Sequence, residues 1–271
     1  MRPLAETMDL AELSKRIEAA GFESLYVPEH THIPVSVGRN HPEDAEWLDA
    51  CKRFFDPFLT LTVVAAATER LKLGTGICLV PQHHPITLAK TVATLDRLSG
   101  GRVLCGVGAG WNGPELANHG VEPGRRWAVL REHVLAMKAI WTTEEAEFSG
   151  EHVRFDSIWQ WPKPVQQPHP PILVGGEGPR ALDRVLEYGD GWLPNDHPEV
   201  GDRIAELNQR ATERGRAPLP VTVYAVPAQP TDIERLAAAG AERCVFNLPN
   251  GGAEVVLSAL RRLAKLIAQW A

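Results

Sequence analysis

Cysteine is scarce in this 271-residue sequence, and its four cysteines form no C-x-x-C pair. That spacing argues against the common metal-binding and dithiol motifs. Cys78, Cys105 and Cys244 lie in or beside apolar segments, where a free thiol behaves as a small hydrophobic side chain. We therefore expect buried free thiols.

The chain also lacks a basic run and a long apolar stretch. Its formal net charge of −6 is spread along the sequence, which argues against a nucleic-acid partner. No segment approaches the roughly 20 apolar residues that a membrane span requires. The first residues read as an amphipathic helix and not as a signal sequence. These absences predict a cytoplasmic protein.

What the sequence does contain is a regular alternation of helix and strand patterns. Helical segments repeat apolar residues every three or four positions, and between them lie short, almost continuously apolar segments. Strands of that kind are buried on both faces, as in the parallel sheet of an α/β protein covered by helices. Seven segments are expected to be strands: 24–27, 71–77, 103–107, 172–175, 191–193, 221–226 and 243–247.

Two architectures fit this alternation, an open doubly wound sheet and a (β/α)8 barrel. The open sheet usually carries one glycine-rich fingerprint after its first strand, and none is present. Glycine-rich or polar loops follow several strands instead, and the length suits one barrel domain over 1–271. Because the chain begins with a helix and offers only seven strands, we expect the first barrel strand to be missing, which leaves two edges to be covered.

Barrel enzymes place their functional residues directly after the strands. The clearest candidate is the loop that follows the strand at 172–175. Its three glycines let the backbone approach an anion, and its proline is expected to begin a helix whose amide groups favour negative charge. We predict that this loop binds a phosphate group. It consists of Gly175, Gly176, Glu177, Gly178, Pro179 and Arg180.

His30 follows the strand at 24–27 and is the candidate catalytic residue. Imidazole, with an ordinary pKa near 6.5, can donate or accept a proton at neutral pH. His30 and His32 also form an H-x-H pair, as in metal-dependent barrel hydrolases, but such sites need further ligands at other strand ends. The ends at 76–78, 108–112 and 192–195 offer few, so a metal-dependent hydrolase is the alternative from another enzyme class.

A second glycine-rich loop follows the strand at 103–107. It lacks an ionisable side chain, so no catalytic acid is expected there, whereas its glycines and tryptophan suit contact with a flat ring. Tight packing of the strand on a helix is the alternative explanation. The candidate residues are Gly108, Ala109, Gly110, Trp111 and Asn112, and an apolar substrate pocket is suggested by Trp47, Phe54, Phe55 and Trp111.

Several blocks of the sequence, taken in order, resemble the luciferase-like monooxygenase superfamily, and most closely its F420-dependent oxidoreductase branch. The resemblance covers about 20–250, and its specificity comes from the joint order and spacing of the blocks. They are ESLYVPEH (23–30), RLKLGTGI (70–77), HPITLAKTVATLDRLSGGRVLCGVGAGWN (84–112), GEHVRFD (150–156), PVQQPHPPILVGG (164–176) and GDGWLP (189–194).

This resemblance implies a TIM (β/α)8-type barrel with an insertion around 147–170. It implies a cofactor ring at the barrel mouth beside His30, and a non-prolyl cis peptide at Gly76–Ile77 that backs the ring. The 106–112 loop would line the cofactor side chain and the 175–180 loop would hold its phosphate. Members are commonly homodimers.

The implied activity is hydride transfer between F420 and a small organic substrate. FMN is the alternative cofactor, and it would permit monooxygenation with a reductase partner. Two departures from the family pattern bear on the substrate. The first strand is missing, and Trp111 stands where sugar-phosphate dehydrogenases of this branch carry a glutamate, so that substrate is not expected. A non-catalytic cofactor-binding barrel is the remaining alternative.

Overall fold

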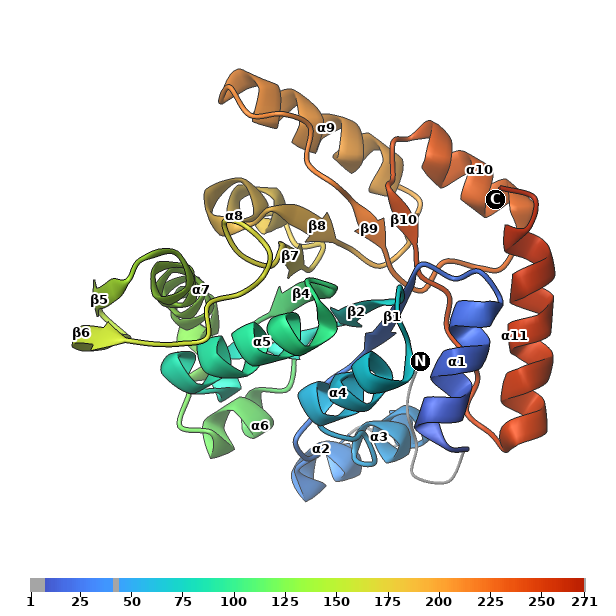
Figure 1. The fold of residues 1–271 in the computed structure, drawn as a ribbon, viewed down its shortest axis with the longest axis horizontal. Coiled ribbons are helices and arrows are strands. Elements are labelled where there is room, and N and C mark those ends of the chain that lie inside the picture. Colours follow the sequence, from blue (N-terminus) through green and yellow to red (C-terminus); the bar gives the residue numbers. More distant parts are fainter. Residues whose placement is uncertain (1–7, 41–43, 271) are drawn as a thin grey trace.

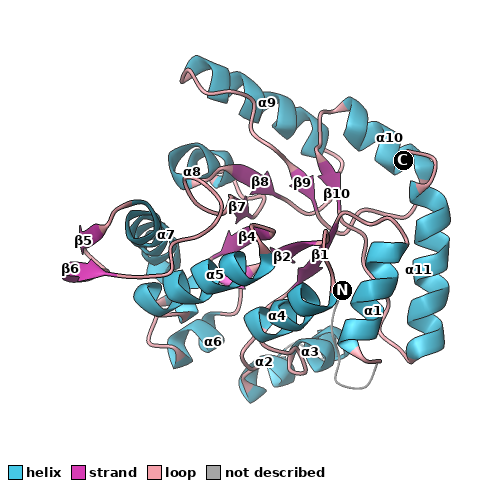
Figure 2. Cartoon of the chain, in the orientation of Figure 1, coloured by secondary structure: helices cyan, strands magenta, loops and turns pink. Residues whose placement is uncertain are grey.

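The computed structural model describes residues 8–40 and 44–270 and has helices packed around parallel strands (Figures 1 and 2). The strands are β1 (Ser24–Val27), β2 (Lys72–Thr75), β3 (Cys78–Leu79), β4 (Val103–Gly108), β5 (Glu145–Ser149), β6 (Arg154–Trp159), β7 (Ile172–Gly175), β8 (Gly191–Leu193), β9 (Thr222–Val223) and β10 (Arg243–Cys244). The helices are α1 (Leu10–Ala19), α2 (Val35–Asn40), α3 (Ala45–Cys51), α4 (Pro57–Ala67), α5 (Pro85–Ser99), α6 (Gly113–Asn118), α7 (Arg126–Thr142), α8 (Ala181–Tyr188), α9 (Val200–Glu213), α10 (Pro230–Ala238) and α11 (Ala253–Ile267).

Local sequence signals account for several helix ends. Asp9 and Asp56 accept the amide protons of Glu12 and Leu59, and so cap the first turns of α1 and α4. Gly100 ends α5 in the left-handed region, at φ +68°, which favours glycine. No helix within 8–40 or 44–270 is long and apolar enough to cross a membrane.

The central sheet is parallel, with strand order β1-β2-β4-β7-β8, and β3 also pairs with β4. Isolated parallel bridges from Trp192 to Val221 and from Asn195 to Tyr224 join β8 to the β9–β10 pair. In Figure 1 the strands lie at the centre, the helices surround them, and the β5–β6 hairpin projects to one side. The α/β class and the parallel sheet predicted from the sequence are confirmed.

A closed barrel is not found, because within the described ranges no backbone pairing joins β1 to β10. We call this gap the seam. It contains a cavity of about 400 Å³ bordered by both strands and by α1 and α11. Across it, Arg243 donates to both carboxylate oxygens of Glu23 at 2.6 and 2.9 Å. A side-chain ion pair thus connects the two strand edges that border the seam.

Several predicted boundaries differ from the structure. The strand expected over 71–77 is split into β2 and β3 by a cis peptide at Gly76–Ile77. The strands expected over 221–226 and 243–247 shrink to two paired residues each, because beyond these the partners are single bridges or loop contacts. The hairpin in the predicted insertion forms as β5 and β6, whereas α2, α3 and α6 were not expected.

The core has an outer and an inner part. The larger cluster fills the space between the strands and the surrounding helices. A smaller cluster lies on the opposite face of the strands, and Ile77 and Tyr224 pack against it partly exposed. Its buried members are Tyr26, Leu104, Leu173, Leu193 and Val245. The inner cluster therefore supports the residues at the carboxyl ends of the strands.

Candidate functional site

A cavity of about 430 Å³ opens at the carboxyl ends of the strands. Most of the site residues predicted from the sequence line it: His30, Gly76, Ile77, Gly108, Ala109, Gly110, Trp111, Gly175, Gly176 and Glu177. Gly178, Pro179 and Arg180 lie in a smaller adjoining pocket, and Asn112 lies in neither. The structure thus brings loops from four strands to one place.

The floor of the cavity is built around Ile77. The peptide bond before it is cis, as the sequence resemblance predicted. A Cβ atom at Gly108 would stand 1.9 Å from Cδ1 of Ile77, and one at Gly175 would stand 3.2 Å from its Cγ2. Any side chain at Gly108 would therefore displace the end of the Ile77 side chain from the cavity floor.

His30 is paired with a buried carboxylate. Its Nδ1 lies 2.7 Å from Oε2 of Glu115, whose side chain is fully buried. Burial alone would raise the pKa of Glu115, but the hydrogen bond and charge of His30, together with the amide of Thr31, lower it below its ordinary value. Ionised Glu115 accepts a hydrogen bond from Nδ1–H, so the lone pair of the neutral ring is on Nε2, on the side of Trp111 and the cavity.

Aromatic side chains form one wall of the cavity. The indole of Trp111 donates to Nε2 of His30 at 3.3 Å, and the two rings meet edge-on. Phe54 packs against His30 from another side, and Trp47 packs against Phe54. Trp47, Phe54 and Trp111 line the cavity as the sequence suggested. Phe55 does not, because its side chain is exposed outside the cavity.

The adjoining pocket, of about 370 Å³, is cationic. Three arginines line it with Trp127: Arg126, Arg180 and Arg184. The guanidinium of Arg184 stacks over the Trp127 ring at 3.6 Å, and Nε of Arg126 is buried with no acceptor within the described ranges. An unpaired buried donor beside two more guanidinium groups is suited to an anion.

The 175–180 loop differs from expectation in one respect. Pro179 does not begin the helix, because α8 starts at Ala181 and Pro179 lies in the preceding turn. The Glu177 carboxylate turns towards Asn195, whose backbone and side-chain amides donate to it at 2.7 and 2.9 Å. Arg203 donates to the carbonyl oxygens of Glu177 and Gly178. Hydrogen bonds from Asn195 and Arg203 thus fix the position of the loop.

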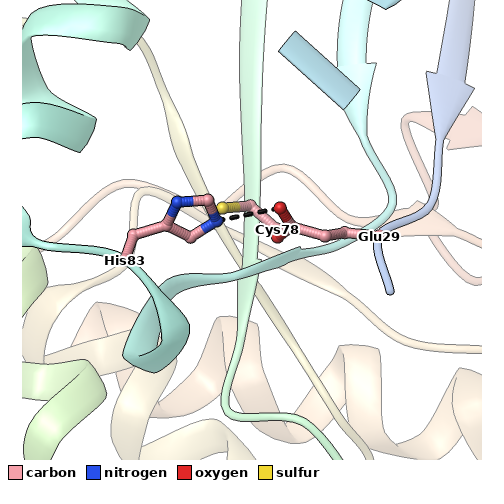
Figure 3. Close-up of side chains that lie close together, drawn as sticks. All are labelled: Glu29, Cys78 and His83. Atoms are coloured by element: carbon pink, nitrogen blue, oxygen red, sulfur yellow. Dashed lines mark hydrogen bonds and ion pairs between the residues drawn. The ribbon is translucent and has the colours of Figure 1, made fainter. Parts of the chain in front are cut away.

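Glu29 forms a second buried cluster beside His30 (Figure 3). It accepts from the Leu79 amide at 2.5 Å and pairs with Nε2 of His83 at 2.8 Å. Burial and the Glu29 charge raise the pKa of the Cys78 thiol well above its ordinary value. The donor atoms of Glu29, Cys78 and His83 lie within 4.8 Å of one another, a spacing that a metal ion could use. Their own hydrogen bonds also account for the arrangement, since together they fix β3 behind the cavity floor.

The H-x-H pair does not converge on one point. His32 lies outside the cavity, hydrogen-bonded to Thr31 and Asn118 and beside the ring of His119. Among the described residues, His30 and His32 belong to no group of three donors close enough for one ion. The hydrolase alternative stays a prediction without a supporting geometry.

Sequence reasoning missed four residues that matter here: Glu115, Arg126, Trp127 and Arg184. For Glu115 a signal existed, since Asn112 and Glu115 have the spacing of a helix cap and an acid in the first turn. Asn112 does cap α6 by accepting the Glu115 amide. The Glu115 side chain, however, turns to His30. Arg126 and Arg184 sit on helices whose patterns gave no hint of the pocket.

The sequence matches the luciferase-like monooxygenase family over residues 3–250. It is 41% identical to an uncharacterised protein of Mycobacterium tuberculosis over 95% of this chain and 93% of that protein. It is 31% identical to an F420-dependent glucose-6-phosphate dehydrogenase of Nakamurella multipartita, over 68% of this chain and 51% of that protein. With the FMNH2-dependent dimethylsulfone monooxygenase of Pseudomonas putida it shares 33% identity over 56% of this chain and 43% of that protein.

The fold is similar to solved structures along nearly the whole chain. Monooxygenase RslO1 from Streptomyces bottropensis superposes with a TM-score of 0.81 at 20% identity, over 97% of this chain and 93% of that one. The coenzyme F420-dependent tetrahydromethanopterin reductase from Methanopyrus kandleri gives a TM-score of 0.69 at 18% identity, over 96% and 93%. At these identities the likeness supports the fold alone.

Proposed function

Since this chain belongs to the luciferase-like monooxygenase family, whose members are enzymes that use F420 or FMN, we propose that it transfers a hydride between F420 and a small organic substrate. The observation that carries the proposal is the cavity in which His30, the Gly76–Ile77 cis peptide and two glycine loops meet, with a cationic pocket adjoining it. We also propose that the strands form a (β/α)8-type barrel that is open at the seam.

The residues fit a cofactor of this shape. The glycine-lined floor around Ile77 leaves room for a flat ring, and His30 and Trp111 stand at its side. Arg126, Arg180 and Arg184 would hold the anionic tail, and the unpaired Nε of Arg126 supplies a donor for it. When bound, the deazaflavin supplies the two-electron chemistry, while the protein supplies binding, orientation and proton transfer.

His30 is the acid–base residue of this proposal. Its Nε2 faces the cavity, where it can take the proton of a substrate hydroxyl while hydride leaves the adjacent carbon. The buried Glu115 carboxylate fixes the ring and stabilises the imidazolium that then forms. Trp47, Phe54 and Trp111 exclude water from the reacting atoms and favour an apolar substrate.

FMN is the second candidate, supported by the identity shared with the FMNH2-dependent relative. With FMN the enzyme would be a monooxygenase that needs a reductase partner. We favour F420 because three arginines surround the adjoining pocket. F420 carries carboxylates beyond its phosphodiester, whereas FMN ends in a single phosphate. The clustered cations match the more highly charged tail.

A homodimer, the single domain over 1–271 and the cytoplasmic location all remain proposals. For the homodimer the structure offers one supporting feature. Helix α4 has the sequence PFLTLTVVAAA, apolar on every side, although Leu59 and Val63 are exposed. A helix that is apolar all round is usually buried all round, so we place the dimer contact on the outer face of α4.

The test is titration of the purified protein with F420 and with FMN, followed by ligand fluorescence. We expect F420 to bind more tightly, and Arg180→Ala to weaken its binding about tenfold or more. Arg214→Ala, an exposed arginine at the end of α9, is the matched control and should leave binding unchanged. Dissociation constants above about 100 μM for both ligands would contradict the proposal.

A further inference from the structure

The Nδ1 atom of His30 faces the protein interior and not the cavity. Nδ1 points at Oε2 of Glu115, and the His30 side chain is only 6% exposed. Because His30 lines the cavity and its side chain is nearly buried, a cofactor and substrate that filled the cavity would separate Nε2 from water. A proton taken from the substrate must then leave His30 through Nδ1 and Glu115, or remain as a charge in a closed site.

The hydrogen bonds of Glu115 continue to the surface. Its Oε1 accepts from the backbone amide of Thr31 at 3.1 Å and from the Thr31 hydroxyl at 3.4 Å. The same hydroxyl lies 2.7 Å from Nε2 of His119 and 2.9 Å from Nδ1 of His32. Thr31 and His119 are exposed, so this chain of polar groups ends in solvent on the outside of the cavity wall.

We propose that Glu115, Thr31 and the surface histidines form a proton relay between His30 and solvent that bypasses the cavity. The proposal rests on the proposed function, because the proposed reaction supplies the proton that the relay carries. It assigns Glu115 a second role beyond orienting the ring. It also assigns a role to His32 and His119, which do not line the cavity.

The steps balance as proton transfers, and no electrons move in them. A substrate proton binds Nε2 of His30, and the Nδ1 proton passes to Oε2 of Glu115. Rotation of the carboxyl group about Cγ–Cδ presents that proton to the Thr31 hydroxyl, which gives its own proton to Nε2 of His119. His119 releases it to water. When the cavity reopens, Nε2 releases its proton to water in the cavity. Nδ1 then regains a proton from solvent through His119, Thr31 and Glu115.

The charges of the groups suit this direction. The pKa of Glu115 is lowered, chiefly by His30 acting against burial, so the carboxylate is ionised and ready to accept. The pKa of His119 is lowered as well, by partial desolvation of its ring and by the neighbouring His32, so its neutral ring can accept from Thr31 and release readily. The other nearby carboxylate, Glu29, is occupied by Leu79 and His83 and lies off the path.

The test needs neither cofactor nor substrate. In protein labelled with 15N-histidine, NMR measures how fast the Nδ1 proton of His30 exchanges with water, and the signal is assigned by its loss in His30→Gln. We expect Thr31→Val, which keeps the shape and removes the hydroxyl, to slow this exchange about tenfold or more. Thr31→Ser retains the hydroxyl and should exchange like the natural protein.

A second variant tests the surface end of the path and leaves the buried residues unchanged. Replacing both surface acceptors, in H32Q/H119Q, should slow the exchange, and added imidazole should restore part of it. An unchanged exchange rate in folded Thr31→Val, with the unfolding temperature as the check, overturns the relay. Failure of F420 and FMN to bind overturns the proposed function instead, and the exchange measurement is independent of that result.

Discussion

At the scale of single residues, Glu29 shows how one buried carboxylate shapes the cavity from behind. It holds the Leu79 amide and the His83 ring, and so anchors β3 directly after the cis peptide. Glu29→Gln keeps the shape but removes the charge. We expect the free energy of unfolding to fall by about 1–3 kcal/mol, because two charge-assisted hydrogen bonds become neutral ones.

That loss should depend on pH. Burial alone would lower the pKa of His83, but the Glu29 hydrogen bond and charge raise it above its ordinary value. A raised pKa means that protonated His83 stabilises the folded state at low pH, and that this contribution disappears as pH rises through the raised value. Denaturant titrations at pH 6 and pH 8.5 should therefore show a larger effect of Glu29→Gln at pH 6. In a His83→Gln background the difference between the two pH values should vanish.

Gly108 offers a test of the cavity floor. An alanine there would force the Ile77 side chain to move, since the new Cβ would stand 1.9 Å from its Cδ1. We expect Gly108→Ala to weaken F420 binding about tenfold while the fold survives, because the displaced atom ends a flexible side chain. Gly38→Ala, where nothing lies within 4 Å, should leave binding unchanged.

Gly106 provides the contrasting case on the same strand. Its added Cβ would stand 2.0 Å from the backbone oxygen of Thr75, which cannot move without breaking the sheet. Gly106→Ala should therefore lower the unfolding temperature and the yield of folded protein. Equal effects of Gly106→Ala and Gly108→Ala on stability would contradict this distinction between a clash with the backbone and a clash with a flexible side chain.

At the scale of elements, α4 carries the prediction for assembly. Leu59→Glu places a charge on its exposed apolar face and should convert a dimer to a monomer, measured by light scattering after gel filtration. Val255→Glu, on the exposed outer face of α11, is the control and should not change the mass. A natural protein that is already monomeric at micromolar concentration would contradict the dimer.

Elements with strong local signals were predictable from the sequence. α5 begins at a proline and ends at Gly100, and β1, β7 and β8 fall where apolar runs stop at polar loops. α6 was not predictable, because six residues with two glycine or proline positions show no periodicity. β9 and β10 were overestimated, since an apolar run tells how deeply a segment is buried and not how many of its residues find a partner.

The same limit applies to the site. Residues that follow a strand, such as His30 and the loop at 175–180, could be placed at the carboxyl ends of the strands from their order alone. Glu115, Arg126 and Arg184 could not be placed at the site in this way, because they lie on helices. The apolar pattern of a helix shows which face is buried, but not which loop that helix contacts. Only the three-dimensional arrangement pairs Glu115 with His30, 85 positions apart in the sequence.

At the scale of the whole molecule, the seam makes one ion pair unusually important. Arg243, with a side chain only 8% exposed, bonds to Glu23 across the unpaired strand edges. The hydrogen bond from Arg243 lowers the pKa of Glu23 to about 2. Because half of the Glu23 side chain is exposed, we expect Glu23→Gln to cost about 1–2 kcal/mol at neutral pH, less than a fully buried pair.

The pH dependence follows from the lowered pKa. The contribution of Glu23 is fully present above the ordinary pKa of a glutamate and is lost as pH falls towards about 2. The stability difference between the natural protein and Glu23→Gln should thus be constant from pH 5 to pH 7 and shrink below about pH 4. Glu254→Gln, which removes an exposed ion pair on α11, should cost almost nothing at any pH.

Carboxylate side chains form hydrogen bonds with backbone amides at the amino ends of the strands, away from the cavity, and this has a consequence for evolution. Glu18 accepts the amides of Glu69, Arg70 and Leu71, and Asp96 accepts those of Val165 and Gln166. Since these hydrogen bonds lie at one end of the strands and the proposed reaction site lies at the other, substitutions around the cavity need not compromise folding. Selection for a new substrate and selection for stability can therefore act on separate sets of residues, which gives lineages of this enzyme room to diverge.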